Sequence, residues 1–275
     1  MMGEASSNIS LETKHVRMVI QQFLYKRLTI NNSHQQHHHR KPMAHQVFFL
    51  VSLLALATLH GMEAVDYVVS NQAATTPGGI VFDNQLGVEY TRQQMELASQ
   101  FIWDLFQQTD PADRKNNIPT VSLFVVDNLP PEVPAATSNN VIYVSDKHIQ
   151  AFSGDQLKPE FNGVLYHEMT HVWQWNGNGQ QDQTLGGLIE GIADFVRLKA
   201  NYIPSGWAQP GQGNNWYDGY SVTARFLEYC EGLRTGFVAE LNKKMRDGYS
   251  TDFFFQLLGK TVDQLWSDYK NQPRN

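Results

Sequence analysis

Cysteine is nearly missing from this sequence, because Cys230 is the single cysteine among 275 residues. No internal disulfide can form, which excludes the small disulfide-rich scaffolds. Charge is also sparse: charged residues make up 17% of the chain and the formal net charge is −6. A broad basic surface for nucleic acid is therefore not expected. What is present, 41% hydrophobic and 12% aromatic residues, predicts a folded chain with a large core.

The N-terminal part of the chain differs in composition from the rest. Residues 1–42 are polar and contain the run HQQHHHR, so we interpret them as an extension that is disordered or not translated, with translation starting at Met43. Thirteen largely apolar residues follow at 47–59, which suits a signal peptide and is too short for a membrane span of about 20 residues. We assign 43–64 to a signal peptide; a buried core helix and a signal anchor are the alternatives.

This assignment leaves residues 65–275 as the mature chain, with 15 basic and 24 acidic side chains and a formal charge of −9. We expect a single domain that is secreted to the extracellular space or apoplast. No nucleic acid is expected, nor a membrane once the signal peptide is removed, and the oligomeric state stays open.

In the first half of this domain, strands alternate with helical patterns. Short strands are predicted at 66–69, 79–82, 121–126 and 141–145. Thr91 and Gln94 form a capping box, so a helix is expected at 92–108. The proline-rich stretch at 129–134 excludes regular structure.

The second half is helical by its pattern of apolar residues. Helices are predicted at 159–175, 188–201, 221–233, 236–247, 251–258 and 261–270, with a loop at 204–215 and a C-capping glycine at Gly259. Because strands come early and helices late, the predicted fold class is α+β. It consists of a small mixed sheet followed by an active-site helix and a helical C-terminal half.

Residues 167–171 read HEMTH, a His-Glu-x-x-His motif. On a helix, His167 and His171 lie one turn apart on one face, where two imidazoles can bind one zinc ion. Glu168 lies beside them and can act as general base on a metal-bound water. A chance match to the motif is the alternative. His148, the remaining histidine of 65–275, is expected at the surface.

A catalytic zinc site needs a third protein ligand and an open position for water. The metzincin histidine is missing, because Gly177 stands six residues after His171. Downstream, Glu190 and Asp194 lie one helical turn apart in GGLIEGIADFVRLK. We predict Glu190 as the third ligand. Asp194 is either the acceptor that orients a ligand histidine or a ligand itself. A solvated acidic pair beside Arg197 is the alternative.

Three further features are candidates for substrate handling. Tyr220, in WYDGYSVTARF, is the predicted hydrogen-bond donor to the oxyanion, ahead of Tyr217 in the same segment, with a core tyrosine as the alternative. The strand at 141–145 is a candidate for the edge strand that pairs with an extended substrate. Trp207 and Trp216, in the loop region, are candidates for an aromatic platform.

Several segments together resemble the plant basic secretory protein family of zinc peptidases. These are HEMTHVWQWNGNG at 167–179, GGLIEGIADFVRLKA at 186–200, GYSVTARFLEYCEGL at 219–233 and FVAELNKKMRDGY at 237–249. The resemblance extends over essentially all of 65–275. It implies a zincin-like fold similar to gluzincins, with zinc bound by His167, His171 and Glu190 and with Glu168 as general base. The acidic charge and the stretch 128–139 depart from the family pattern, which leaves the substrate preference open.

The resulting hypothesis is a secreted zinc metallopeptidase that hydrolyses peptide bonds through a zinc-bound water and acts in plant defence. Its expected partner is a peptide or protein substrate. The alternative is a secreted defence protein without catalytic activity. Such a protein would keep the zincin-like fold and bind a microbial or cell-wall component.

Overall fold

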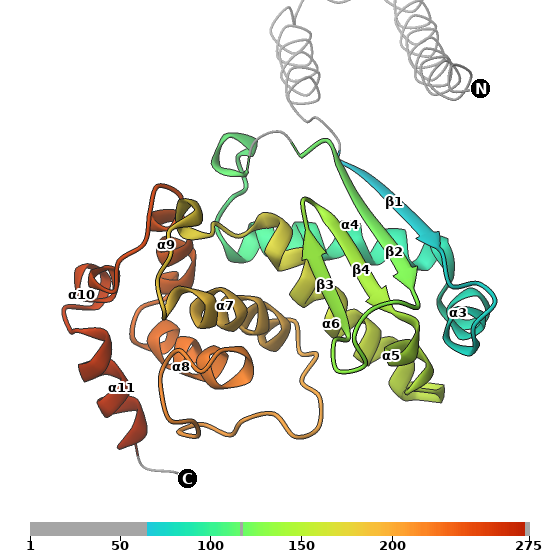
Figure 1. Cartoon of the computed structure of the whole chain (residues 1–275). Helices are drawn as coiled ribbons and strands as arrows, with labels where there is room; N and C mark the ends of the chain where they lie inside the picture. The colour runs from blue at the N-terminus through green and yellow to red at the C-terminus, as the bar shows by residue number, and fades with distance from the viewer. Residues whose placement is uncertain (1–64, 116–117, 273–275) are drawn as a thin grey trace, which may run out of the picture. The chain divides into compact units, whose positions relative to one another are not determined.

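The computed structural model describes residues 65–115 and 118–272 (Figure 1). The predicted extension at 1–42 and the predicted signal peptide at 43–64 lie outside these residues. Contacts within Glu63–Asn275 make this part of the chain one compact unit. Within the described ranges, no helix combines the length and the apolar character that crossing a bilayer requires.

A four-stranded mixed sheet forms the core of the first half. Its strands are β1 (Asp66–Asn71), β2 (Thr120–Val126), β3 (Ala135–Ser138) and β4 (Val141–Ser145). The order is β1-β2-β4-β3, with β3 antiparallel to β4 and the other pairs parallel. The strand predicted at 141–145 is confirmed, but its prediction as an edge strand is wrong, because β4 pairs on both sides. The two edge strands are β1 and β3. The sequence analysis did not predict β3.

Two long helices pack against one face of this sheet. They are α4 (Gly87–Leu105) and α6 (Leu157–Trp173), and Figure 1 shows both behind the strands. Trp173 joins them: its ring meets that of Trp103 edge-on at 4.9 Å, and its Nε1 donates to Ser99 Oγ at 3.0 Å. These contacts hold α6 against α4 on that face of the sheet.

The strand predicted at 79–82 is wrong, because this segment is helical. Helix α3 (Pro77–Val81) continues into a π-helical turn at Phe82–Leu86. Thr76 caps α3 by accepting from the backbone N–H of Gly79, and Pro77 occupies its first turn. The apolar run GIVF is typical of a strand, but Thr76 and Pro77 before it form a helix start signal, and the segment folds as a helix.

The capping box predicted at Thr91 is also wrong. Helix α4 starts earlier, at Gly87, so that Thr91 lies inside it and donates to the Gly87 carbonyl oxygen at 2.8 Å. The short helix α5 (Asp146–Gln150) follows β4, and 3₁₀ turns lie at Pro111–Asp113, Gly154–Gln156 and Gly177–Gly179.

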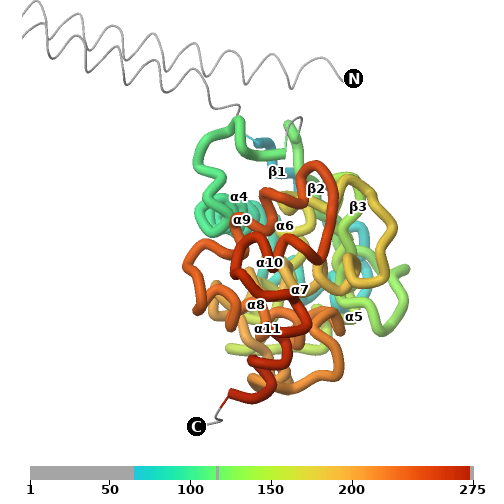
Figure 2. Tube along the Cα trace, turned by 90° about the vertical axis from the view of Figure 1, so that its left-hand side faces the viewer, coloured from blue at the N-terminus to red at the C-terminus, as the bar shows by residue number. Residues whose placement is uncertain are grey.

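The helical C-terminal half agrees with the sequence pattern. It contains α7 (Leu185–Lys199), α8 (Tyr220–Leu233), α9 (Phe237–Lys244), α10 (Asp252–Leu258) and α11 (Val262–Lys270). Gly259 caps α10 in the left-handed conformation, as predicted. In Figure 2 these helices face the viewer, and the sheet lies behind them.

An aromatic cluster around Phe226 forms the core of the C-terminal half. The rings of Trp216, Phe254, Trp266 and Tyr269 all lie within 6.4 Å of the Phe226 ring, measured between centroids. Trp216 is only 4% exposed. Its prediction as a surface platform is therefore wrong.

Candidate metal centre

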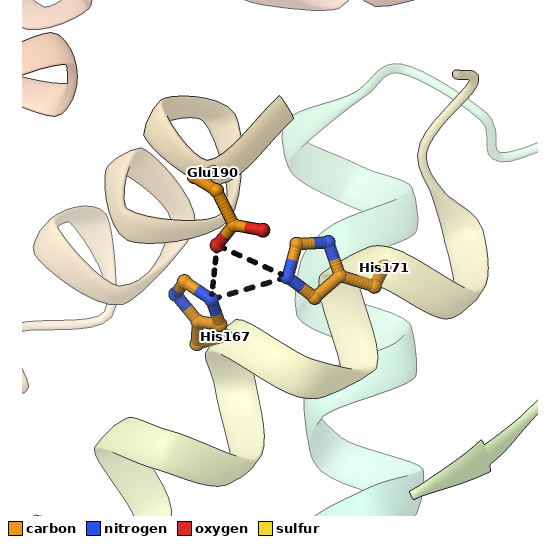
Figure 3. A group of neighbouring side chains, drawn as sticks. All are labelled: His167, His171 and Glu190. Atoms are coloured by element: carbon orange, nitrogen blue, oxygen red, sulfur yellow. Dashed lines mark hydrogen bonds and ion pairs between the residues drawn. The ribbon is translucent and has the colours of Figure 1, made fainter. Parts of the chain in front are cut away.

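Three side chains from two helices point toward one another in Figure 3: His167 and His171 from α6, and Glu190 from α7. The two Nε2 atoms lie 3.1 Å apart. Oε2 of Glu190 lies 3.1 Å from Nε2 of His167 and 3.6 Å from Nε2 of His171. One ligand atom from each residue falls within 4.8 Å of the others. Two imidazole nitrogens and one carboxylate oxygen form a donor set that suits zinc.

Asp194 lies one turn after Glu190 and contacts His167 from the other side. Its Oδ1 lies 2.8 Å from Nδ1 of His167, and the residue is only 4% exposed. An acceptor at Nδ1 keeps a proton on that nitrogen and fixes the ring so that Nε2 faces Glu190. The predicted pair of acids is thus not a solvated one.

The electrostatics of the site favour positive charge. Burial lowers the pKa of His167, but hydrogen bonds to Asp194 and Glu190 and the charge of Glu168 outweigh it and raise that pKa to about 10. Burial raises the pKa of Glu190, and the hydrogen bonds and charges of the two histidines lower it far below its ordinary value. A cation bound between these groups would meet the same attraction.

Glu168 is buried and is hydrogen-bonded to the edge strand β3. Thr137 on β3 donates its hydroxyl to Oε2 of Glu168 at 2.7 Å, and the same hydroxyl lies 3.2 Å from the Glu168 carbonyl oxygen. The sequence analysis missed Thr137. Its contact with Glu168 joins positions 31 residues apart, so no local pattern could have indicated it.

Gln174 holds the second histidine. It follows the last residue of α6, and its Nε2 lies 2.7 Å from Nδ1 of His171, three residues earlier in the last turn of the helix. The Oε1 atom of this buried amide has no hydrogen-bond partner among the described residues. The sequence analysis missed Gln174 as well, although its spacing of three from His171 was a usable signal.

Tyr220 lies at the first position of α8, beside the triad. Its ring stacks on the His167 ring at 5.9 Å and 10°, and the residue is 58% exposed, so it is not a core tyrosine. Its φ of +44° is unusual for a residue other than glycine and marks local strain. Burial, followed by the charge of Glu190, raises the pKa of its phenol.

Close packing brings Tyr220 to this place. Gly187 on α7 lies so close to the backbone of Tyr217 that an added Cβ would overlap the Tyr217 carbonyl oxygen. Gly219 then turns the chain with a φ of +85° just before α8 begins. A side chain at Gly187 would push the Tyr220 segment away from α7, whereas a side chain at Gly219 would be strained by the positive φ.

These groups line one cavity of about 760 Å³. Its lining includes residues 132–137, which end in β3, and Trp207, Tyr220 and Ser221. Trp207 is half-buried there, with the Arg197 guanidinium 5.7 Å from its ring, and remains a candidate platform. A cavity of this size can hold several residues of an extended peptide.

His148 is not the exposed surface residue that the sequence predicted. It is half-buried, stacks edge-on with Phe152 at 5.1 Å, and its Nε2 has no hydrogen-bond partner among the described residues. Burial, assisted by the charge of Arg197, lowers its pKa to about 4. It does not belong to the triad.

Comparison with known proteins places this geometry in context. Residues 62–269 match a family described as "Peptidase of plants and bacteria". A "Basic secretory protease" of Boswellia serrata is 47% identical over 55 residues, which are 20% of this chain. The match spans 61% of the length of that relative. No solved structure matches the chain.

Proposed function

The chain belongs to the family of peptidases of plants and bacteria, and from this membership we propose that it is a secreted zinc metallopeptidase of the gluzincin-like type. The observation that carries the proposal is the convergence of His167, His171 and Glu190 within 4.8 Å. These three residues would hold the zinc ion. Structural zinc sites are usually closed by a fourth protein ligand, whereas three ligands leave a position for water.

Bound zinc would supply a Lewis acid that makes water nucleophilic near neutral pH. Glu168 accepts the proton of the attacking water and returns it to the leaving amine. Thr137 holds the Glu168 carboxylate in place for both transfers. Tyr220 donates a hydrogen bond to the oxygen on which negative charge develops, since its exposed phenol lies beside the triad.

The proposed substrate is an extended peptide or protein segment that pairs with β3. This strand is hydrogen-bonded to β4 on one side only, and its residues line the cavity. An edge of this kind offers backbone groups to a peptide strand. The zincin-like fold assignment rests on the combination of this edge strand, the motif helix α6 and the downstream glutamate on α7.

Secretion and a role in plant defence complete the proposal. The relative from Boswellia serrata carries the word "secretory" in its name, and residues 43–64 have the pattern of a signal peptide. If cleavage follows Ala64, mass spectrometry of protein secreted by a plant host will find Val65 at the N-terminus. A secreted protein that retains Met43 would contradict the signal-peptide assignment.

The deciding experiment measures casein hydrolysis and zinc content on protein made from the full chain. Three forms are compared: the wild type, Glu168→Ala, and Glu96→Ala as a control on the exposed face of α4. We expect about one zinc per chain in all three, with hydrolysis lost only in Glu168→Ala.

Other outcomes separate the parts of the proposal. Zinc without hydrolysis in any form would support the alternative, a defence protein that binds a microbial or cell-wall component without cleaving it. Folded protein without zinc would overturn the metal assignment. Equal hydrolysis by Glu168→Ala and the wild type would overturn the role of Glu168.

A further inference from the structure

A second hollow of about 480 Å³ lies next to the cavity that contains the triad. Lys115 and Asn176 line both spaces, so they lie at the boundary between the two. The second hollow is also lined by Trp175, Asn140 and Arg246. No role in the proposed chemistry falls to these residues.

Lys115 differs from the other charged groups around the triad. Glu190 and Asp194 face histidines, and Arg197 contacts Glu160 at 3.1 Å. Lys115 is half-buried, yet within residues 65–115 and 118–272 no carboxylate lies within ion-pair distance of it. A half-buried ammonium group loses hydration, and an anionic ligand would restore the lost stabilisation. Burial lowers the pKa of this lysine, in keeping with its lack of a counter-ion.

Arg246 adds a second cation to this hollow. Its guanidinium lies 5.4 Å from the centre of the Trp175 ring and makes no ion pair with another described residue. Asp247 lines the same hollow, but it is exposed and pairs with neither cation. The Trp175 ring provides an apolar wall that can cover the methylene groups of a bound side chain.

The position of the hollow fits a peptide lying along β3. Thr137 contacts Glu168, which marks the catalytic centre, and Asn140 lies three residues further along the chain. Asn139 and Asn140, both with positive φ, form the turn that ends β3, so the hollow lies just past the end of this strand. An extended substrate peptide advances about 3.3 Å per residue. A substrate side chain two or three residues from the scissile bond would therefore reach the hollow.

We propose that this second hollow is a substrate subsite for an acidic side chain, and that Lys115 is the residue that selects aspartate or glutamate there. The inference rests on the proposed peptidase function and names a substrate class for it. It also explains how a chain with an acidic net charge can bind an acidic segment, because charges beyond about 8 Å are screened at physiological salt and the nearest groups dominate.

The test uses synthetic peptides that differ only in Glu or Gln at the second or third residue from the cleaved bond. Zinc-loaded wild type should cleave the Glu peptide about tenfold faster, measured as kcat/KM. The ratio of kcat/KM for the Glu peptide to that for the Gln peptide should fall to about one in Lys115→Met and below one in Lys115→Glu. Lys147→Met, at an exposed position on α5, is the matched control and should keep the wild-type ratio. Equal ratios in the wild type and Lys115→Met would overturn the subsite.

A binding measurement separates this inference from the proposed function. The same peptides are titrated onto the Glu168→Ala protein, with and without Lys115→Met. Tighter binding of the Glu peptide that depends on Lys115 supports the subsite even if no form hydrolyses peptide. Hydrolysis without any preference at these positions leaves the peptidase in place and overturns the subsite.

Discussion

The hydroxyl of Thr137 lies 2.7 Å from Oε2 of Glu168, which connects the edge strand of the sheet to the proposed general base. Strand β3 thus has two roles in the proposed mechanism. Its backbone edge receives the substrate, and one of its side chains fixes the carboxylate that moves the proton. A displacement of β3 would therefore disturb substrate binding and proton transfer together.

Thr137→Val removes this hydrogen bond while keeping the shape of the side chain. A hydrogen bond to a charged group contributes about 1.5–3 kcal/mol, so we expect kcat to fall by at least about tenfold. KM should change little, because the backbone of β3 remains. Thr137→Ser keeps the hydroxyl and should retain most of the activity. Steady-state kinetics on one peptide measures both constants, and an unchanged kcat in Thr137→Val would contradict this role.

Asp194→Asn tests the partner of the first histidine. The amide cannot replace the charge that holds the proton on Nδ1 of His167, so zinc affinity should fall about 10–100-fold. Competition with a chromogenic chelator measures this affinity without any need for turnover. Asp182→Asn, at an exposed position, should bind zinc as tightly as the wild type. If both variants match the wild type, Asp194 does not support the metal site.

Gln174 is expected to accept a hydrogen bond from Nδ1 of His171, as Asp194 does from Nδ1 of His167. Rotation of its amide by 180° brings the unpaired Oε1 to Nδ1, where it accepts the proton that a zinc-bound imidazole carries there. Gln174→Leu should therefore weaken zinc binding by about tenfold or more, and Gln174→Glu should preserve it. The same chelator competition measures both. Equal loss in the two variants would mean that Gln174 matters only for packing.

Two adjacent glycines of α7 provide a matched pair for stability. A Cβ at Gly187 would overlap the Tyr217 backbone, whereas one at Gly186 meets nothing within 4 Å. Gly187→Ala should cost about 1–3 kcal/mol of unfolding free energy and should also lower kcat by moving Tyr220. Gly186→Ala should be neutral or slightly stabilising, because alanine favours the helix. Urea unfolding of both variants checks the difference, and similar stabilities would contradict the close approach.

His148 predicts a pH dependence of stability. Its pKa is about 4 in the fold and 6.5 in the unfolded chain, so the unfolded chain binds an extra proton between these values. The free energy of unfolding therefore falls as the pH drops through this window, by up to roughly 3 kcal/mol. His148→Phe keeps a ring against Phe152 and should flatten this part of the profile. Urea unfolding from pH 7.5 to 4, with a chelator present, measures it; identical profiles would refute the assignment.

Local patterns predicted those parts of the fold and site that depend on neighbours along the chain. The helices from α7 to α11 follow the apolar period, and the motif at 167–171 and the acids of α7 follow helical spacing. Strand β3 was missed because AATS is short and lacks the alternation of a half-buried strand. Contacts such as Thr137 with Glu168 depend on how separate elements pack, which no period in the sequence encodes.

The triad joins the sheet-bearing half, which supplies the histidines through α6, to the helical half, which supplies Glu190 and Tyr220 through α7 and α8. Neither half alone contains a complete set of ligands. During synthesis the histidines leave the ribosome before the glutamate and the tyrosine. A nascent chain therefore cannot assemble the proposed metal centre until α7 and α8 have docked against α6.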